Sequence, residues 1–191
     1  ARKNIPLTVS VVTRQILEES NESALLPAIS EQIPGLFVTE RGVTGFGVAD
    51  GAAGQVNLRG LGGNPTTQVL ILIDGNPQFM GMMGHPLPDA YVTSDAERVE
   101  VIRGPGSILY GSNAFGGVIN IITRKQKKDG LTASGRVMYG SYNTQKYMAT
   151  AGYRKKGFNF FSSINHDRTD GHRDSSDFKI TNGYIKAGYD F

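Results

Sequence analysis

The chain of 191 residues contains no cysteine and no tryptophan. Without cysteine, disulfide bonds and thiolate-bound metal sites are excluded. Long hydrophobic runs are also missing: the longest apolar stretch is VLILI, residues 69–73, whereas a membrane-spanning helix needs about 20 apolar residues. The formal charge of +3 is small and scattered, which argues against nucleic acid as a partner.

Acidic and aromatic residues are distributed unevenly along the chain. Twelve of the 17 acidic residues lie in 1–130, whereas 11 of the 17 Phe and Tyr residues lie in 131–191. This shift in composition indicates two different environments. We place the boundary in the basic segment KQKKDG and expect a first domain over 1–125, a linker over 126–130 and a second region over 131–191.

The first region mixes short helices and short strands, which predicts an α+β fold with a small mixed sheet and two or three short helices. RQILEES predicts one helix. NESALLPAISEQIPG predicts a second helix that is capped by Asn21 or Ser23 and ends at Pro34-Gly35. VLILI is apolar on both faces, which is typical of a strand covered on both sides. The other predicted strands are LTVSVVT, LFVTE, QVNLRG, RVEVIRG and GVINIITR.

Two features of this region indicate turns. Asp74-Gly75 follows the VLILI run and predicts a turn. The connection RGPGSILYGSNAFGG predicts a tight re-entrant path, because proline at 105 suits the start of a short helix and glycine permits left-handed backbone and close packing. Its turn-forming residues are Gly104, Pro105, Gly116 and Gly117.

Long loops are expected over 41–54 and 76–94. The second carries a cluster formed by Phe79, Met80, Met82, Met83 and His85. Methionine and histidine are ligands for soft metals and for haem iron, so Met82, Met83 and His85 are candidate metal ligands. The plainer alternative is a flexible apolar loop without a metal.

The second region alternates in polarity. LTASGRVMYG, KYMATAGY and ITNGYIKAGYDF carry apolar residues on one face, with short and long polar connections between the strands in turn. Strands of about ten residues with one apolar face and terminal aromatic residues are typical of a transmembrane β-barrel wall. An ordinary amphipathic antiparallel sheet is the alternative that the pattern leaves open.

Several motifs occur here in an order that resembles a known family. LRG, VLILIDG and VEVIRGPGSILYGSNAFGGVINIITR resemble the plug domain of the TonB-dependent outer-membrane receptors, and LLPAISEQIPGLFV resembles the plug helix of that family. The resemblance covers residues 5–125. Residues 131–191 resemble the first barrel strands, with DRTDGHRDSSDF similar to the second outer loop.

The resemblance implies a receptor in the outer membrane of a Gram-negative bacterium, and no enzyme or resident cofactor. Such a receptor binds a scarce iron–siderophore chelate, haem or another metal chelate, and imports it when the TonB complex acts on the plug inside a barrel of roughly 22 strands. The TonB-coupling segment is not recognisable before Asn4. Residues 131–191 supply at most four strands, whereas the smallest membrane barrels need about eight, so we expect part of a longer receptor.

The resemblance also implies roles for individual residues. Arg59 and Arg103 would latch the plug by pairing with glutamates of the inner barrel wall, although pairing inside the plug with Glu100 or Asp74 is the alternative. Phe79, Met80, Met82, Met83 and His85 would contact ligand from an apical loop. Lys125, Lys127 and Lys128 would form a solvated linker at the periplasmic rim.

The rival hypothesis is a soluble α+β module that binds or hydrolyses a ligand with its glycine-rich loops. The loops lack the Gly-Lys-Ser/Thr ending of a phosphate loop, and the spacing of Ser107, His85 and Asp89 does not support a catalytic triad.

Overall fold

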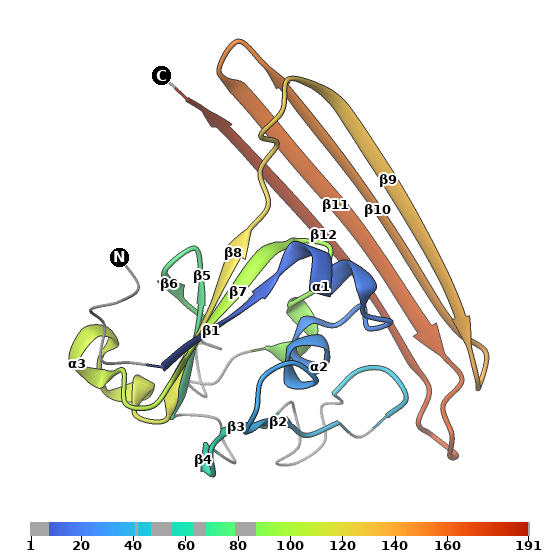
Figure 1. The fold of residues 1–191 in the computed structure, drawn as a ribbon. Coiled ribbons are helices and arrows are strands. Elements are labelled where there is room, and N and C mark those ends of the chain that lie inside the picture. Colours follow the sequence, from blue (N-terminus) through green and yellow to red (C-terminus); the bar gives the residue numbers. More distant parts are fainter. Residues whose placement is uncertain (1–7, 41, 47–54, 63–67, 79–86, 191) are drawn as a thin grey trace.

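A computed structural model describes residues 8–40, 42–46, 55–62, 68–78 and 87–190 (Figure 1). Two parts lie side by side: a group of short elements, here called the plug, and a tall sheet of four long strands, here called the wall. The helices of the plug are α1 (Arg14–Glu19), α2 (Leu25–Ser30) and α3 (Ser107–Tyr110), with 3-10 turns at Pro88–Ala90 and Ser112–Ala114.

The strands of the plug form a five-stranded and a three-stranded sheet. The five-stranded sheet has the order β1-β7-β8-β5-β6, and its β5–β8 pair is parallel while the other pairs are antiparallel, so the predicted mixed sheet is confirmed. Its strands are β1 (Thr8–Thr13), β5 (Val69–Ile73), β6 (Asn76–Pro77), β7 (Ala96–Arg103) and β8 (Gly117–Thr123). The second sheet holds β2 (Leu36–Val38), β3 (Val56–Leu58) and β4 (Leu61–Gly62).

The plug has an apolar core between α2 and the sheets. Leu25, Leu26 and Ile29 of α2 are fully buried, and the first four residues of β5 are buried as predicted for a strand covered on both faces. The helix is shorter than predicted, and its N-cap is Ala24. The predicted caps, Asn21 and Ser23, are therefore wrong, because the Ser23 hydroxyl instead donates to Asp167 of the wall.

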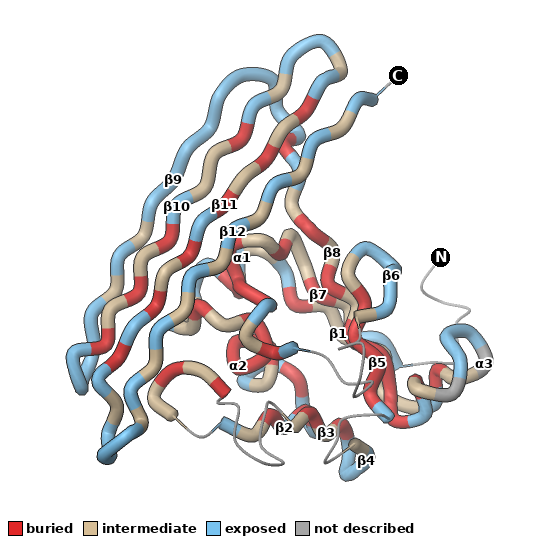
Figure 2. Tube along the Cα trace, turned by 180° about the vertical axis from the view of Figure 1, so that it is seen from behind, coloured by how far each residue is buried: buried red, intermediate tan, exposed pale blue. Residues whose placement is uncertain are grey.

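The wall is an antiparallel meander of four strands, with β9 and β12 at its open edges. Its strands are β9 (Gly130–Gly140), β10 (Thr144–Lys155), β11 (Phe158–Thr169) and β12 (Phe178–Tyr189). Figure 2 shows buried and less buried residues in alternation along β10 and β11. This alternation follows from the pleat of a strand, which sends successive side chains to opposite faces.

The two faces of the wall differ in chemistry. The face turned away from the plug carries exposed apolar side chains: Leu131, Val137, Tyr139, Tyr153, Phe158, Ile164, Ile185 and Tyr189. Ile185 is 72% exposed and Leu131 is 75% exposed. A contiguous exposed apolar surface of this kind marks a site of contact with a membrane or another protein. The predicted fold class, a plug with a small mixed sheet followed by antiparallel hairpins, is confirmed. Among the described residues, no helix is long and apolar enough to cross a membrane.

Candidate functional site: the interface between plug and wall

The face of the wall that meets the plug is polar. Buried polar residues of β10 and β11 occupy alternate positions on it: Thr144, Lys146, Asn159, Ser163, Asn165, Asp167 and Thr169. Buried polar groups are stable only when they are hydrogen-bonded. The plug supplies partners for several of them, in three clusters along the strands.

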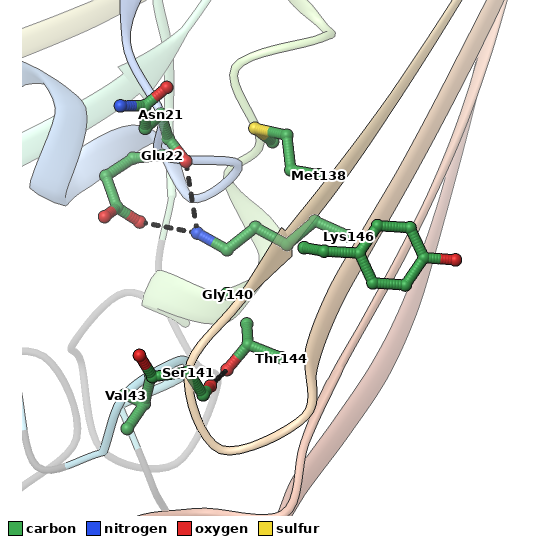
Figure 3. A pocket seen from close by; sticks show the side chains of 9 residues that line it. Asn21, Glu22, Val43, Met138, Gly140, Ser141, Thr144 and Lys146 are labelled. Atoms are coloured by element: carbon green, nitrogen blue, oxygen red, sulfur yellow. Dashed lines mark hydrogen bonds and ion pairs between the residues drawn. The ribbon is translucent and has the colours of Figure 1, made fainter.

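The first cluster lies near the turn between β9 and β10 (Figure 3). Lys146 Nζ lies 2.9 Å from Glu22 Oε2 and donates to the Asn21 carbonyl at 3.3 Å. The Lys146 side chain is only 9% exposed, whereas that of Glu22 is 33% exposed, so the ion pair is shielded from water mainly on the lysine side. Next to it, Ser23 Oγ donates to Asp167 Oδ2. A cavity of about 470 Å³ opens beside Lys146, lined also by Met138.

The second cluster lies at the middle of β11. Ser163 Oγ donates to Asp95 Oδ1, and Ser94 Oγ donates to the same oxygen at 3.1 Å. Burial raises the pKa of Asp95, although both hydrogen bonds act in the opposite direction. The Arg124 guanidinium lies over the ring of Phe161, with its central carbon 4.7 Å from the ring centroid. This cation–π contact attaches Arg124 to β11 through an aromatic ring and not through a carboxylate.

The third cluster joins the turn after β5 to β12. The Thr123 backbone N–H donates to Asp74 Oδ1 at 2.8 Å, and its hydroxyl donates to Asp74 Oδ2 at 2.5 Å. Lys186 Nζ then donates to Asp74 Oδ2 at 2.7 Å and to Thr123 Oγ1 at 2.6 Å. Burial alone would raise the pKa of Asp74, but the hydrogen bonds from Lys186 and Thr123 outweigh it and hold the pKa below its usual range.

Two further hydrogen bonds reach from the wall to plug carbonyl groups. Asn182 Nδ2 of β12 donates to the Asp89 carbonyl at 3.0 Å, and Arg136 Nη1 of β9 donates to the Glu18 carbonyl at 3.0 Å. All four strands of the wall therefore make at least one polar contact with the plug. Each of these contacts contributes only modestly, so the attachment is distributed over several points.

The predicted latch arginines lie on the plug away from these clusters. Arg59 is exposed in the turn between β3 and β4, where its φ is 54° and its backbone N–H donates to Gly35 at 2.7 Å. Arg103 ends β7, and its Nε is buried without a hydrogen-bond partner among the described residues. Glu100 pairs with Arg98 at 2.8 Å and Asp74 pairs with Lys186, so both acids considered for pairing inside the plug have other partners.

Of the predicted turn residues, Asp74 and Gly75 lie in a turn, and the others lie between β7 and the start of β8. Asp74 and Gly75 have φ values of 48° and 85° between β5 and β6. Gly104 and Pro105 follow β7, and Gly116 and Gly117 precede or begin β8. At Gly117, with φ 151°, an added Cβ would lie 2.5 Å from the Ile102 carbonyl oxygen, so the backbone packs too closely there for a side chain.

The predicted ligand loop, with Phe79, Met80, Met82, Met83 and His85, lies outside the described residues. The metal hypothesis for Met82, Met83 and His85 therefore stays a prediction. Among the described residues, no group of three His, Asp or Glu side chains could hold a metal ion. The plug-facing contacts of Lys146, Asp167 and Lys186 were not predicted from the sequence. The alternation of the strands could have indicated them, because each lies on the face of its strand opposite to the exposed apolar residues.

Comparison with known proteins identifies the family. Residues 1–118 match the TonB-dependent Receptor Plug Domain. The chain belongs to this family. Over 133 residues it is 38% identical to the iron-regulated outer membrane virulence protein of Vibrio cholerae serotype O1, and over 119 residues it is 37% identical to the vitamin B12 transporter BtuB of Vibrio vulnificus. These alignments cover 66% and 61% of this chain, but only 18% and 17% of the relatives.

A solved structure shows the same fold. The copper transporter OprC superposes with a TM-score of 0.74 at 21% sequence identity, over 95% of this chain and 28% of that protein. The chain spans less than a fifth of the length of the curated relatives that it matches. Membership in the TonB-dependent receptors places the chain in the outer membrane of a Gram-negative bacterium, as predicted. This family membership favours the receptor over the rival soluble module.

Proposed function

We propose that this chain belongs to a receptor that binds an iron chelate, haem or a similar scarce nutrient at the outer membrane and imports it when TonB supplies energy. The observation that carries the proposal is the contrast between the two faces of the wall. Its outer face is apolar and exposed, whereas its inner face is polar and bonded to the plug. A barrel wall that lies in a lipid bilayer and encloses a plug requires both an apolar outer face and a polar inner face.

The polar interface suits a plug that must be displaced. A hydrogen bond between plug and wall contributes only about 0.5–1.5 kcal/mol net, because water replaces each partner when the contact opens. The carboxylates and the ammonium groups here can therefore exchange one partner for another during movement. An apolar interface of equal size would have to expose its surface to water, at a cost of about 25 cal/mol per Å².

The nutrient class rests on the relatives. The Vibrio cholerae relative is iron-regulated by name, which favours an iron compound, and the vitamin B12 and copper transporters make cobalamin and copper the alternatives to test. Ligand contacts are proposed at Phe79, Met80, Met82, Met83 and His85. Arg59 and Arg103 are proposed to hold the plug in the complete barrel. The Nε of Arg103 supports this role, because it is buried and has no hydrogen-bond partner among the residues that the structure describes.

Uptake by cells that carry the complete receptor tests the proposal. Growth under iron limitation is measured with haem, with several ferric siderophores, with cobalamin and with copper, in strains with and without TonB. The proposal expects growth on at least one iron compound that requires both the receptor and TonB. Growth that is independent of TonB, or transport of none of the iron compounds, would contradict it.

A further inference from the structure

One end of the wall carries an excess of positive charge. The end at which the chain passes from plug to wall combines residues 124–130, the turn between β10 and β11, and Asp190. We call this group the basic rim. Its bases are Arg124, Lys125, Lys127, Lys128, Arg154, Lys155 and Lys156, and its acids are Asp129 and Asp190.

The acids at this end engage only some of the bases. Asp190 pairs with Lys125 at 3.2 Å and with Arg154 at 2.6 Å, and Asp129 lies 3.4 Å from Arg154. Lys127 pairs with Glu97 of the plug. Three exposed lysines remain that make no ion pair within the described part of the chain: Lys128, Lys155 and Lys156.

The strand register places this charge beside the membrane face. Lys155 pairs with Phe158 across β10 and β11, and Phe158 pairs with Tyr189 across β11 and β12. These three residues therefore form one row on the outward face, with Phe158 43% and Tyr189 58% exposed. The next row on this outward face, closer to the middle of the strands, contains Tyr153 and Leu131, which are also exposed and largely apolar. Aromatic rows of this kind mark the level of lipid headgroups.

The opposite end of the wall differs. Residues 168–179, which surround the connection between β11 and β12, contain three bases, Arg168, Arg173 and Lys179, and three acids, Asp170, Asp174 and Asp177. Arg168 pairs with Asp170 at 3.2 Å. That end is therefore balanced in charge. Of the two described ends of the wall, only the basic rim carries an excess of positive charge.

We propose that the basic rim binds the phosphate groups of anionic phospholipids in the leaflet that contacts this end. The long lysine side chains can lie along the aromatic row and place their ammonium groups at headgroup level. Each lysine near an anionic surface strengthens binding several-fold, because the attraction acts within a Debye length of the charge. The ligand is a lipid, because the unpaired lysines lie directly beside the exposed apolar face of the wall.

Reconstitution of the complete receptor tests this proposal. The receptor is placed in bilayers of phosphatidylcholine with and without phosphatidylglycerol, and the lipids that remain bound after gentle detergent extraction are counted by mass spectrometry. We expect enrichment of phosphatidylglycerol. The double variant Lys155→Gln with Lys156→Gln should weaken this enrichment roughly twentyfold, as the loss of two surface lysines predicts. Inorganic phosphate at millimolar concentration should not displace the lipid.

The matched control is Lys179→Gln, an exposed lysine of the opposite, charge-balanced end, which should leave the enrichment unchanged. Equal enrichment in wild type and double variant, equal loss in the control, or displacement by free phosphate would each overturn the proposal. Migration of the unheated receptor on a gel checks that every variant is folded. The proposal rests on the membrane location of the wall and not on transport, and the assay contains no nutrient, so a failed uptake experiment would leave its outcome unaffected.

Discussion

The plug and the wall differ in the residues that they bury. In the plug, Leu25, Leu26 and Ile29 are fully buried in an apolar core, as in a water-soluble domain. In the wall, Asn165 and Asp167 are buried, whereas Ile185 is 72% exposed. The surroundings of each part, and not its hydrophobic content, therefore decide which side chains are buried. The plug packs against the polar face of the wall, whereas the apolar face of the wall is exposed.

The largest expected effect concerns the core of the plug. Ile29→Ala should lower the free energy of unfolding of the plug by about 2–5 kcal/mol, because it leaves a cavity at a fully buried position. Protease digestion of the complete receptor at increasing urea concentrations measures this loss. Ile29→Val is the control and should cost about 0.5–1.5 kcal/mol. Equal resistance of the alanine variant and the wild type would show that α2 is not part of a packed core.

The matching test in the wall introduces a charge on the outward face. Ile164→Arg should destabilise the receptor in bilayers by about 2–4 kcal/mol, because Ile164 lies at the middle of β11 on the face assigned to lipid. Refolding into lipid vesicles measures the change. Ile164→Val should be nearly neutral. An arginine variant as stable as the wild type would indicate that this face contacts water.

A smaller effect is expected at the interface between the two parts. Asp74→Asn and Lys186→Gln should each destabilise the attachment by about 1 kcal/mol, since both side chains are about one-third exposed and water screens the pair. A double-mutant cycle on plug proteolysis should give a coupling energy of about 0.5–1 kcal/mol. Strictly additive effects would mean that the two groups do not interact.

The smallest effect is a dependence on pH. Because the pKa of Asp74 is held below its usual range, its contact with Lys186 is fully present above the usual pKa of an aspartate and is lost only as the pH falls through the lowered value. The contribution of the pair, taken as wild type minus Asp74→Asn, should therefore be constant from pH 8 to about pH 5 and decline below pH 4. A decline that begins near pH 6 would contradict this assignment.

Much of the plug could be predicted from the sequence because its signals are local. VLILI specifies a strand buried on both faces, and the Asp74-Gly75 step specifies a turn. The predicted N-cap of α2 was wrong because the Ser23 hydroxyl donates to a residue distant in sequence, Asp167. No local pattern encodes such a contact.

The interface was harder to predict for the same reason. Lys146 and Lys186 look like solvated strand residues until the wall is placed against the plug. Asp74 was predicted to form a turn, with pairing to a plug arginine as an alternative, whereas its carboxylate binds Lys186 of β12. Alternation along a strand shows that a residue faces inward, but it does not show which plug residue it meets.

Crosslinking tests the central claim, that the plug rests on the inner face of the wall. Asp95→Cys with Ser163→Cys replaces two hydrogen-bonded side chains, and the chain has no cysteine of its own. Asp95→Cys with Ile164→Cys is the control, because the neighbouring residue points to the opposite face. In the complete, unliganded receptor, the first pair should crosslink under oxidation and the control should not. Crosslinking of both pairs equally, or of the control alone, would contradict the account.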